Sequence, residues 1–300
     1  MRYLADRLAP GGRVARYRPL RGGVSASVYL AHLRTSDGGR RTVVVRRYAA
    51  PWHRADSDLC HREFRVLDEL GTRSFPAPRP LLVDSRGDAF GAPTLVITRL
   101  PGRPVVRTES LDNYLQQMAS TLVELHNLPI DAFHFLPEQT ALLSNALGQR
   151  PPVDEAPEPG LREVVLREWP EVSASPSRRT LVHGDYWPGN LLWQRGRLVG
   201  VVDWEDACLG DPVRDVAICR GDLTLLFGLD AADAFLRHYE AAAGRSLSTM
   251  PFWDRLTCTL ALPELDRWLP GWQALGRPDL TLATARERFR SLAHAALSRP

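Results

Sequence analysis

The segment from Leu181 to Glu205, LVHGDYWPGNLLWQRGRLVGVVDWE, constrains the fold more than any other part of this chain. Residues 191–194 and 197–202 are short apolar runs, and Arg195-Gly196 separates them. Two such runs around a two-residue turn predict a β-hairpin. The polar residues around this hairpin are therefore expected to have fixed positions.

Two oxygen-bearing side chains border the predicted hairpin. With a two-residue turn, Asn190 lies opposite Val201, and Asp203 lies one diagonal step away on the same face. Diagonal neighbours are roughly 7–8 Å apart at the backbone. An amide oxygen and a carboxylate at this separation can share one Mg²⁺ ion, which takes few protein ligands and completes its shell with water and nucleotide oxygens.

A third polar residue, Asp185, lies on the loop that precedes the hairpin. Glycines flank this loop, and the apolar runs on both sides are expected to hold it while leaving the carboxylate exposed. One loop Asp, a following Asn190 and the later Asp203 match the base and the two metal ligands of kinase-type phosphoryl transfer. The alternative is that the three side chains merely cap turns, as Asp and Asn often do.

HGDYWPGN followed by VVDWE resembles the catalytic segment of the aminoglycoside phosphotransferase family, whose choline kinase-like and antibiotic-modifying members are relatives of protein kinases. The family pattern is HGD, four residues, N, and then a D after a strand. The resemblance implies that Asp185 is the catalytic base and that Asn190 and Asp203 bind magnesium. It also implies a small-molecule hydroxyl as phosphate acceptor.

Composition limits the function without choosing it. The chain has 300 residues, of which 44% are hydrophobic and 24% charged, which is ordinary globular usage and enough for one large or two modest domains. No run approaches the roughly 20 apolar residues of a membrane span. The first ten residues, MRYLADRLAP, lack the apolar region of a signal peptide, so we expect a cytoplasmic protein without a membrane partner.

The cysteines and the basic residues exclude further classes of site. The four cysteines (Cys60, Cys208, Cys219 and Cys258) are scattered, which predicts neither a zinc site nor a disulfide framework. All 38 basic residues are arginine, so contacts with phosphate must come from arginine or backbone amides. A net charge of +3 with dispersed arginines does not indicate nucleic acid as a partner.

The first part of the chain is expected to be rich in strands, with one helix. Residues 13–20 and 28–33 read as two strands joined by a small-residue loop. Small residues allow backbone N–H groups to approach an anion closely, which makes this loop a candidate for nucleotide phosphates. A plain glycine-rich turn is the alternative reading. The candidate phosphate-binding residues are Gly22, Gly23, Ser25 and Ser27.

The next expected strand, residues 42–48, contains Arg46 and Arg47. By resemblance, Arg46 takes the position of the cation that contacts nucleotide phosphates, and Arg47 takes it if the register differs by one. Two arginines on a solvated strand edge are the alternative. Residues 57–70 have helical spacing and end at Gly71. The resemblance implies that Glu63 of this helix pairs with the strand cation.

Three prolines, Pro76, Pro78 and Pro80, predict an extended passage, which leads into a strand at residues 94–98. The following residues, 99–102, resemble the family's hinge between lobes. By this resemblance, backbone groups around Thr98 and Leu100 bind the adenine edge.

The second part of the chain is expected to be mainly helical. An amphipathic helix is predicted at residues 110–126. Residues 137–179 are expected to be irregular apart from a helix at 161–169, either as a wall of the acceptor site or as a linker. Residues 204–207 read as the start of a helix-prone stretch. The segments 223–243 and 255–298 read as helical with breaks at prolines. The aromatic residues Phe252, Trp253, Trp268 and Trp272 read mostly as core, and the lining of an acceptor pocket is the alternative.

Gly210-Asp211-Pro212-Val213-Arg214-Asp215 resembles a family element in which the last Asp braces the catalytic loop. The resemblance therefore gives Asp215 a supporting role. Glu205, two residues after Asp203, is a candidate to assist the metal or to contact the acceptor.

Together these features predict an α+β, two-lobed protein-kinase-like fold, with an antiparallel-sheet lobe at residues 1–100 and a mainly helical lobe at 101–300. The expected activity is transfer of the terminal phosphate of ATP, or GTP, with Mg²⁺, to a hydroxyl of an antibiotic or a metabolite. Macrolides, choline, homoserine and sugars remain alternative acceptors, and antibiotic resistance is one possible role. A catalytically inactive nucleotide-binding pseudokinase is the rival function. A nucleotide-dependent hydrolase or dehydrogenase is disfavoured because GxGxxG and Walker sequences are absent.

Overall fold

The computed structural model describes residues 2–20, 26–49, 56, 58–149, 160–174 and 178–298, and the chain divides into two compact units. The sheet of the first unit is rich in β-branched residues, which favour strands. Unit 1 comprises residues 1–102 and 199–205, and unit 2 comprises residues 103–198 and 206–300. The segment 199–205, which sequence order places in the helical lobe, thus belongs to unit 1. No helix in the described part of the chain is both long and apolar enough to cross a membrane.

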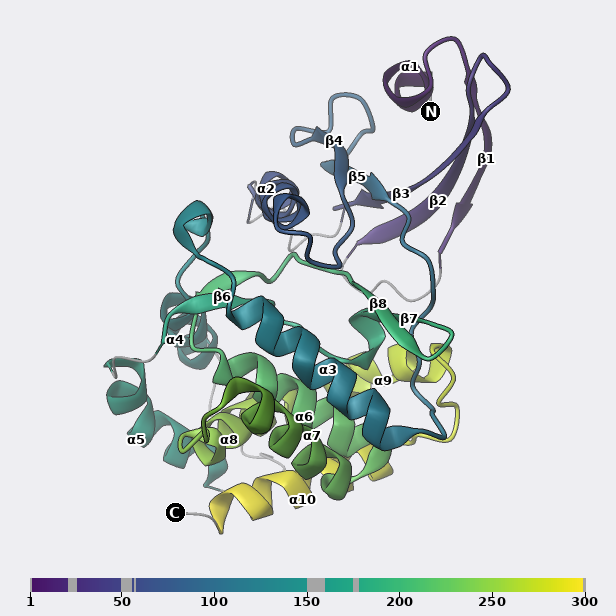
Figure 1. Ribbon diagram of the computed structural model, residues 1–300. Coiled ribbons are helices and arrows are strands. Elements are labelled where there is room, and N and C mark those ends of the chain that lie inside the picture. Colours follow the sequence, from purple (N-terminus) through teal and green to yellow (C-terminus); the bar gives the residue numbers. More distant parts are fainter. Residues whose placement is uncertain are drawn as a thin grey trace. The chain divides into compact units, whose positions relative to one another are not determined.

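Unit 1 is an antiparallel sheet with the strand order β1-β2-β3-β5-β4 (Figure 1). Helix α2 packs against β4 and β5, and Val43, Val45 and Val96 lie in the core of the sheet. Its elements are α1 (Arg2–Leu8), β1 (Arg13–Pro19), β2 (Ser27–Arg34), β3 (Arg40–Arg47), α2 (Leu59–Thr72), β4 (Pro80–Asp84) and β5 (Thr94–Thr98).

Four of the five strands, β1, β2, β3 and β5, and helix α2 confirm the sequence analysis of this unit, with three corrections. Helix α1 was not expected. Strand β4 begins at Pro80, inside the passage expected to be merely extended; it is an edge strand, where proline is tolerated because no ladder N–H is required. Helix α2 continues through Gly71 and ends at Thr72, with Arg73 as C-cap at a negative φ, so no left-handed glycine ends it.

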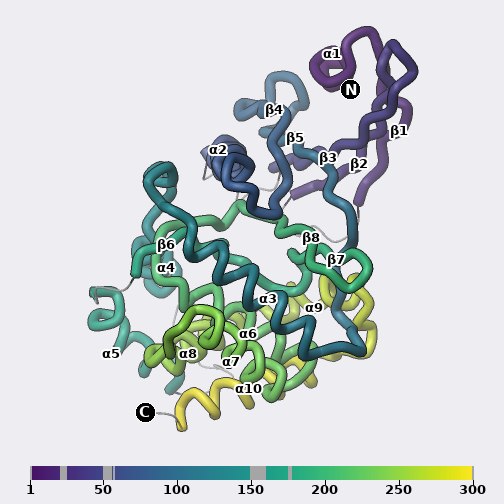
Figure 2. Tube along the Cα trace, in the orientation of Figure 1, coloured from purple at the N-terminus to yellow at the C-terminus, as the bar shows by residue number. Residues whose placement is uncertain are grey.

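Unit 2 consists mainly of helices (Figures 1 and 2). Helix α6 packs against α7, α8 and α10, and α3 packs against α7. The elements of this part of the chain are α3 (Leu111–His126), η2 (Asp131–Phe133), α4 (Gln139–Gln149), α5 (Leu161–Ala174), β6 (Thr180–Val182), η3 (Pro188–Asn190), β7 (Leu191–Gln194), β8 (Arg197–Val201), β9 (Cys208–Gly210), α6 (Val213–Phe227), α7 (Leu229–Ala243), α8 (Met250–Ala261), η4 (Leu262–Glu264), α9 (Leu265–Ala274) and α10 (Leu282–Leu297).

The hairpin β7-β8 and helix α3 confirm the sequence analysis, whereas other segments differ. Helix α4 lies in the stretch expected to be irregular. The expected helix start at 204–207 is wrong: these residues are followed by strand β9, which pairs with β6. Pro251 and Pro270 do not break helices; the first occupies the first turn of α8, where its missing N–H costs nothing, and the second lies within the short helix α9.

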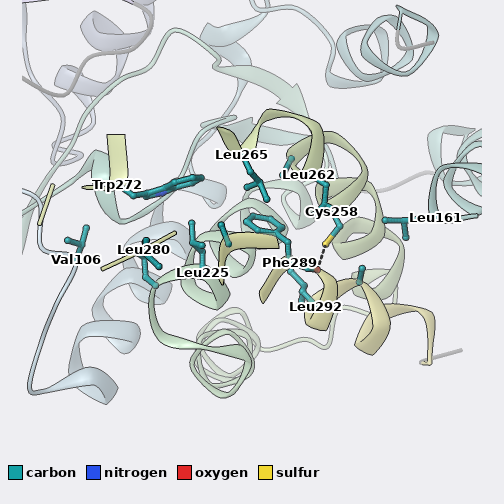
Figure 3. Close-up of a cluster of buried hydrophobic side chains, with 14 residues drawn as sticks. Val106, Leu161, Leu225, Cys258, Leu262, Leu265, Trp272, Leu280, Phe289 and Leu292 are labelled. Carbon is teal, nitrogen blue, oxygen red and sulfur yellow. Dashed lines mark hydrogen bonds between the residues drawn. The ribbon is translucent and has the colours of Figure 1, made fainter. Parts of the chain in front are cut away.

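The core of the helical unit joins α6, α8, α9 and α10 (Figure 3). Leu225, Leu265, Leu292 and Phe289 are buried in it, and the Cys258 thiol donates to the Phe289 carbonyl at 3.6 Å. All four cysteines of the chain are buried free thiols. The apolar contacts of this core fix α6 against α8, α9 and α10.

A buried arginine adds a second connection between α6 and its neighbours. The Arg220 guanidinium donates to the Asp254 carboxylate of α8 from Nε and Nη2, at 3.0–3.2 Å, and to the Ala232 carbonyl of α7 at 2.8 Å. It also forms an ion pair with Asp233 at 3.1 Å. Burial lowers the pKa of Arg220, but Asp254 and Asp233 outweigh that effect and raise it.

Replacing Asp254 by alanine should destabilise unit 2, because among the described residues it leaves Arg220 buried with one paired carboxylate, Asp233. Removing one partner of a buried ion pair costs roughly 3–5 kcal/mol. Chemical denaturation followed by circular dichroism measures the loss. The control is Asp112→Asn, because Asp112 is exposed and its ion pair is with His238, itself partly exposed. A free energy of unfolding equal to that of the wild type would show that the Arg220 network does not hold these helices.

Candidate active site

Arg46 lies at the centre of a polar cluster in unit 1. It is 6% exposed, and its Nε lies 3.5 Å from Oε1 of Glu63 in α2, which is 2% exposed. Tyr48 bridges the two: Arg46 Nε donates to Tyr48 Oη at 3.1 Å, and that hydroxyl donates to Glu63 Oε2. Strand alternation places Arg46 and Tyr48 on one face of β3. Arg47 lies on the other face, where its Nη2 donates to the Phe90 carbonyl.

The other end of the Arg46 guanidinium contacts two carboxylates. Nη2 donates to Asp203 Oδ1 at 2.5 Å and to Glu205 Oε2 at 3.1 Å. Burial lowers the pKa of Arg46, but Asp203 and Glu63 outweigh it, so the pKa is raised. Burial raises the pKa of Glu63, and the nearby guanidinium opposes this. Three carboxylates, those of Glu63, Asp203 and Glu205, therefore contact the same guanidinium.

The backbone of Asp203 departs from the strand geometry expected from the sequence. Its φ is +71°, in the left-handed region that few residues other than glycine and Asn or Asp adopt. Asn190 is the last residue of the 3-10 turn η3 and not a strand residue. Asn190 directly precedes β7, and Asp203 follows β8. The expected position of Asn190 opposite Val201, with Asp203 one diagonal step away, stays a prediction.

The expected nucleotide contacts of unit 1 are only partly described. Gly22, Gly23 and Ser25 lie outside the described residues, and Ser27 is the exposed first residue of β2. The Thr98 N–H donates to the Arg79 carbonyl at 2.8 Å, and its hydroxyl accepts from the Arg79 N–H. The Thr98 amide is thus used within the unit, and Leu100 is half-buried beyond the end of β5.

In unit 2, Asp185 and Asn190 are hydrogen-bonded to each other. Asn190 Nδ2 donates to the Asp185 carbonyl at 2.9 Å and to its carboxylate Oδ2 at 2.8 Å. With its amide nitrogen so engaged, Asn190 directs its Oδ1 away from Asp185, and no described residue donates to that oxygen. The pair thus offers a half-buried carboxylate beside an amide oxygen that suits a hard cation.

Asp215, in the first turn of α6, holds the backbone that leads to Asp185. Its Oδ2 accepts from the His183 N–H at 2.7 Å, and its Oδ1 accepts from the Gly184 N–H at 2.8 Å. His126 Nε2 lies 3.1 Å from the same carboxylate. Burial raises the pKa of Asp215, but the hydrogen bond and charge of His126 outweigh it, with further help from His183, so the pKa lies below its usual value.

Two glycines are required by the path of this loop. Gly184 has a φ of +83°, and a Cβ there would lie 2.3 Å from the Asp206 carbonyl oxygen. A Cβ on Gly189 would lie 2.2 Å from the Trp187 ring. The HGD and PG elements of the sequence are therefore steric requirements of the loop as well as sites of chemistry.

Sequence reasoning missed three contributors to these clusters. Tyr48 was not considered, although its position two residues after Arg46 places both on one strand face. His183 accepts from the Asp185 N–H at Nδ1, at 3.2 Å, which orients the loop and leaves the proton of its neutral imidazole on Nε2. His126 contacts Asp215 and, at 2.8 Å, Tyr239 of α7; no local pattern reveals a pairing so distant in sequence.

The structure thus groups the candidate residues in two sets. Arg46, Glu63, Asp203 and Glu205 lie together in unit 1. Asp185, Asn190 and Asp215 surround one loop in unit 2.

Comparison with known proteins gives a family match over most of the chain. The model of the Phosphotransferase enzyme family matches residues 16–256. This confirms the family resemblance based on the HGDYWPGN and VVDWE segments.

Curated relatives match with modest identity. Acyl-CoA dehydrogenase family member 10 of Mus musculus is 24% identical over 76% of this chain, which spans 22% of that protein's length. Viomycin phosphotransferase of Streptomyces vinaceus is 32% identical over 48% of this chain and 55% of its own length. Homoserine kinase of Chelativorans sp. (strain BNC1) is 27% identical over 77% of this chain and 73% of its own length.

Solved structures match over nearly the whole chain. A putative aminoglycoside phosphotransferase from Ralstonia eutropha JMP134 has a TM-score of 0.67 at 17% identity, covering 98% of this chain and 95% of that one. An amicoumacin kinase, solved with AMP-PNP, Ca²⁺ and its antibiotic, has a TM-score of 0.67 at 17% identity, covering 97% and 92%. These matches confirm the predicted α+β, protein-kinase-like fold.

Asp215→Asn should destabilise the protein by roughly 3 kcal/mol at neutral pH, because an amide cannot replace a charged acceptor of several N–H groups. The pKa of Asp215 is lower in the folded protein than its ordinary 3.8. The stability that it contributes is therefore complete above about pH 4 and is lost as the pH falls through the folded-state pKa. Denaturation of both proteins at pH 7, 5 and 3 should show a difference that is constant at first and shrinks at pH 3. A difference that grows toward pH 3 would contradict the assigned role.

Proposed function

The chain belongs to the Phosphotransferase enzyme family, and from this premise we propose that it transfers the terminal phosphate of ATP or GTP to a hydroxyl group of a small molecule. The observation that carries this proposal is the Asp185–Asn190 pair on a loop anchored by Asp215. A fixed carboxylate beside a metal-binding amide oxygen is what kinase-type transfer needs, since that reaction depends on positioning and charge stabilisation.

The residues present fit Mg²⁺ as the cofactor. Asn190 Oδ1 and the Asp203 carboxylate are hard oxygen ligands, and few protein ligands are typical where phosphate oxygens complete the shell. Asp203 lies beside the Arg46 guanidinium together with the carboxylates of Glu63 and Glu205, so this part of unit 1 presents carboxylate oxygens of the kind that Mg²⁺ binds. When bound, the ion neutralises charge on the phosphates. The neighbouring amicoumacin kinase structure, which contains AMP-PNP and Ca²⁺, supports a nucleotide with a divalent metal.

Arg46 is the proposed phosphate contact, because the chain has no lysine and this guanidinium is fixed by Glu63 and Tyr48. In the described structure the guanidinium pairs with Asp203. Nucleotide and metal together would replace that pairing, with phosphate taking the arginine and the metal taking the carboxylate. Gly22, Gly23, Ser25 and Ser27 remain proposed contacts for phosphate, and Thr98 and Leu100 for the base.

Asp185 is the proposed base. It orients the acceptor hydroxyl and accepts its proton as the new oxygen–phosphorus bond forms and the bond to the departing nucleoside diphosphate breaks. Asp215 supports Asp185 through the His183-Gly184 backbone. Glu205 holds Arg46 in the described structure and remains a candidate to assist the metal or the acceptor.

The acceptor is proposed to be an antibiotic or a metabolic alcohol. Among the relatives, viomycin phosphotransferase is named for an antibiotic acceptor and homoserine kinase for a metabolic alcohol. We place the reaction in the cytoplasm, where ATP is available. An antibiotic acceptor would make the enzyme a resistance factor.

The proposed function is tested by measuring nucleoside diphosphate release from ATP and GTP, with Mg²⁺, over a panel of antibiotics and small alcohols. Asp185→Asn should lower turnover of the best acceptor by about a hundredfold or more, because it removes the base. Its nucleotide affinity, measured by calorimetry, should stay near that of the wild type. Asp230→Asn, an exposed substitution in α7, is the control. Turnover by Asp185→Asn equal to that of the wild type would contradict the role given to Asp185. If the wild-type protein releases no nucleoside diphosphate with any acceptor, the result would favour a pseudokinase.

Asn190→Ala and Asp203→Asn should each raise the Mg²⁺ concentration that gives half-maximal nucleotide binding, by about tenfold or more, as expected when a ligand is lost. Each has a matched exposed control: Asn145→Ala in α4 and Asp88→Asn in the β4–β5 connection. Titration of nucleotide binding with Mg²⁺ measures the effect. An unchanged metal requirement in both variants would contradict the proposed ligand pair.

A further inference from the structure

Asp222 of α6 is a carboxylate that the proposed reaction does not use. Its Oδ1 accepts from the indole N–H of Trp272 in α9 at 2.9 Å. Within the described residues this neutral donor is its one hydrogen-bond partner, and the residue is half-buried. A carboxylate accepts several hydrogen bonds, so Asp222 retains unused capacity.

Neighbouring carboxylates of unit 2 are paired much more completely. Asp254 accepts from the Arg220 guanidinium, and Asp215 accepts from two backbone N–H groups and contacts His126. Two arginines near the C-terminal end of α6, Arg277 and Arg288, donate to the carbonyls of Leu226 and Leu225. Burial raises the pKa of Asp222 to about 7, and the Trp272 hydrogen bond opposes this only partly. A cation beside Asp222 would offset the free-energy cost of keeping this buried carboxylate ionised.

Aromatic rings surround the indole that binds Asp222. Trp187 and Trp268 each meet the Trp272 ring edge-to-face, with centroids 6.3 Å apart in both pairs. Both flanking rings are half-buried, whereas Trp272 is buried at the edge of the core in Figure 3. Half-exposed indoles next to a carboxylate offer dispersion and cation–π contact to an organic cation.

The catalytic loop itself supplies one of these rings. Trp187 follows Asp185 by two residues, and its ring lies against Gly189, where a Cβ would be 2.2 Å away. The 3-10 turn η3 packs against α6, which carries Asp222. The tryptophan cluster thus extends from the loop of the proposed base to an under-paired carboxylate, within one unit.

We propose that Asp222, with Trp187, Trp268 and Trp272, forms an acceptor subsite for a hydroxyl compound that carries an ammonium group beside an apolar body. This inference rests on the proposed kinase function, since it names the acceptor class of that site. One carboxylate among indoles suits a single amine on an apolar framework. A polycation would need several carboxylates around it.

A pair of isosteric probes tests the charge requirement. Benzyl(2-hydroxyethyl)dimethylammonium carries a permanent cation, and 3,3-dimethyl-4-phenylbutan-1-ol replaces its nitrogen by carbon. Calorimetry and tryptophan fluorescence should show that the wild type binds the cation about tenfold more tightly, because the cation gains ionic attraction to the Asp222 carboxylate and cation–π contact with the indoles, without donating a hydrogen bond. Equal affinity for the two probes, or no binding of the cation, would overturn the proposal.

Asp222→Asn keeps the oxygen that accepts from Trp272 and removes the charge. It should abolish the preference for the cation and leave the affinity for the neutral alcohol within about twofold, while Asp230→Asn keeps the preference. A retained preference in Asp222→Asn would overturn the proposal. If Asp222→Asn does not fold by circular dichroism, Trp268→Leu decides: cation binding should weaken by about two- to fivefold through the lost ring. Unchanged binding there would count against the subsite.

Turnover separates this inference from the proposed function. Binding of the cationic probe without any nucleotide-dependent phosphorylation of acceptors would contradict the kinase function and leave the subsite intact. Phosphorylation of neutral and cationic alcohols with equal efficiency would support the kinase and contradict the subsite.

Discussion

The Asp215 carboxylate is the interaction on which the helical unit's site depends. It is fully buried, and it remains ionised because two consecutive backbone N–H groups and His126 all point at it. Through those contacts it fixes the His183-Gly184 backbone, so the path of the chain into Asp185 is determined by a residue of α6. Because the Arg220 network and the apolar core hold α6 against its neighbouring helices, the loop that carries Asp185 is anchored to several helices.

The polar cluster of unit 1 follows the opposite principle. There one guanidinium, Arg46, contacts three carboxylates, those of Glu63, Asp203 and Glu205. Burial raises the pKa of Glu63, which shows the cost of holding a carboxylate in this cluster. The left-handed backbone of Asp203 adds local strain of the kind that is often retained at functional positions. The cluster is thus suited to exchange partners when a metal and phosphates bind.

Much of the fold was predictable because its elements carry their own local signals. The hairpin around Arg195-Gly196 and the amphipathic helix α3 are examples, and both are confirmed. Errors arose where context decides. The prolines at 76, 78 and 80 predict only an extended passage, but Pro80 starts an edge strand, whose outer N–H positions need no partner. The residues after Asp203 carry a helical composition, yet β9 forms because β6 provides its ladder. Tertiary pairing overrides propensity in such short segments.

Some residues of the candidate site are predictable from the sequence, and others are brought together only by tertiary packing. Residue types and spacing were enough to single out Asp185, Asn190 and Asp203, because phosphoryl transfer requires few groups and their order along the chain is visible. Acceptor recognition has no such order: Trp187 and Trp272 are 85 positions apart in the sequence, and they meet only through helix packing. What distinguishes Asp222 from Asp215 is also invisible in sequence, since both are aspartates of α6. The number of donors around each carboxylate decides which is a support and which remains open to a ligand.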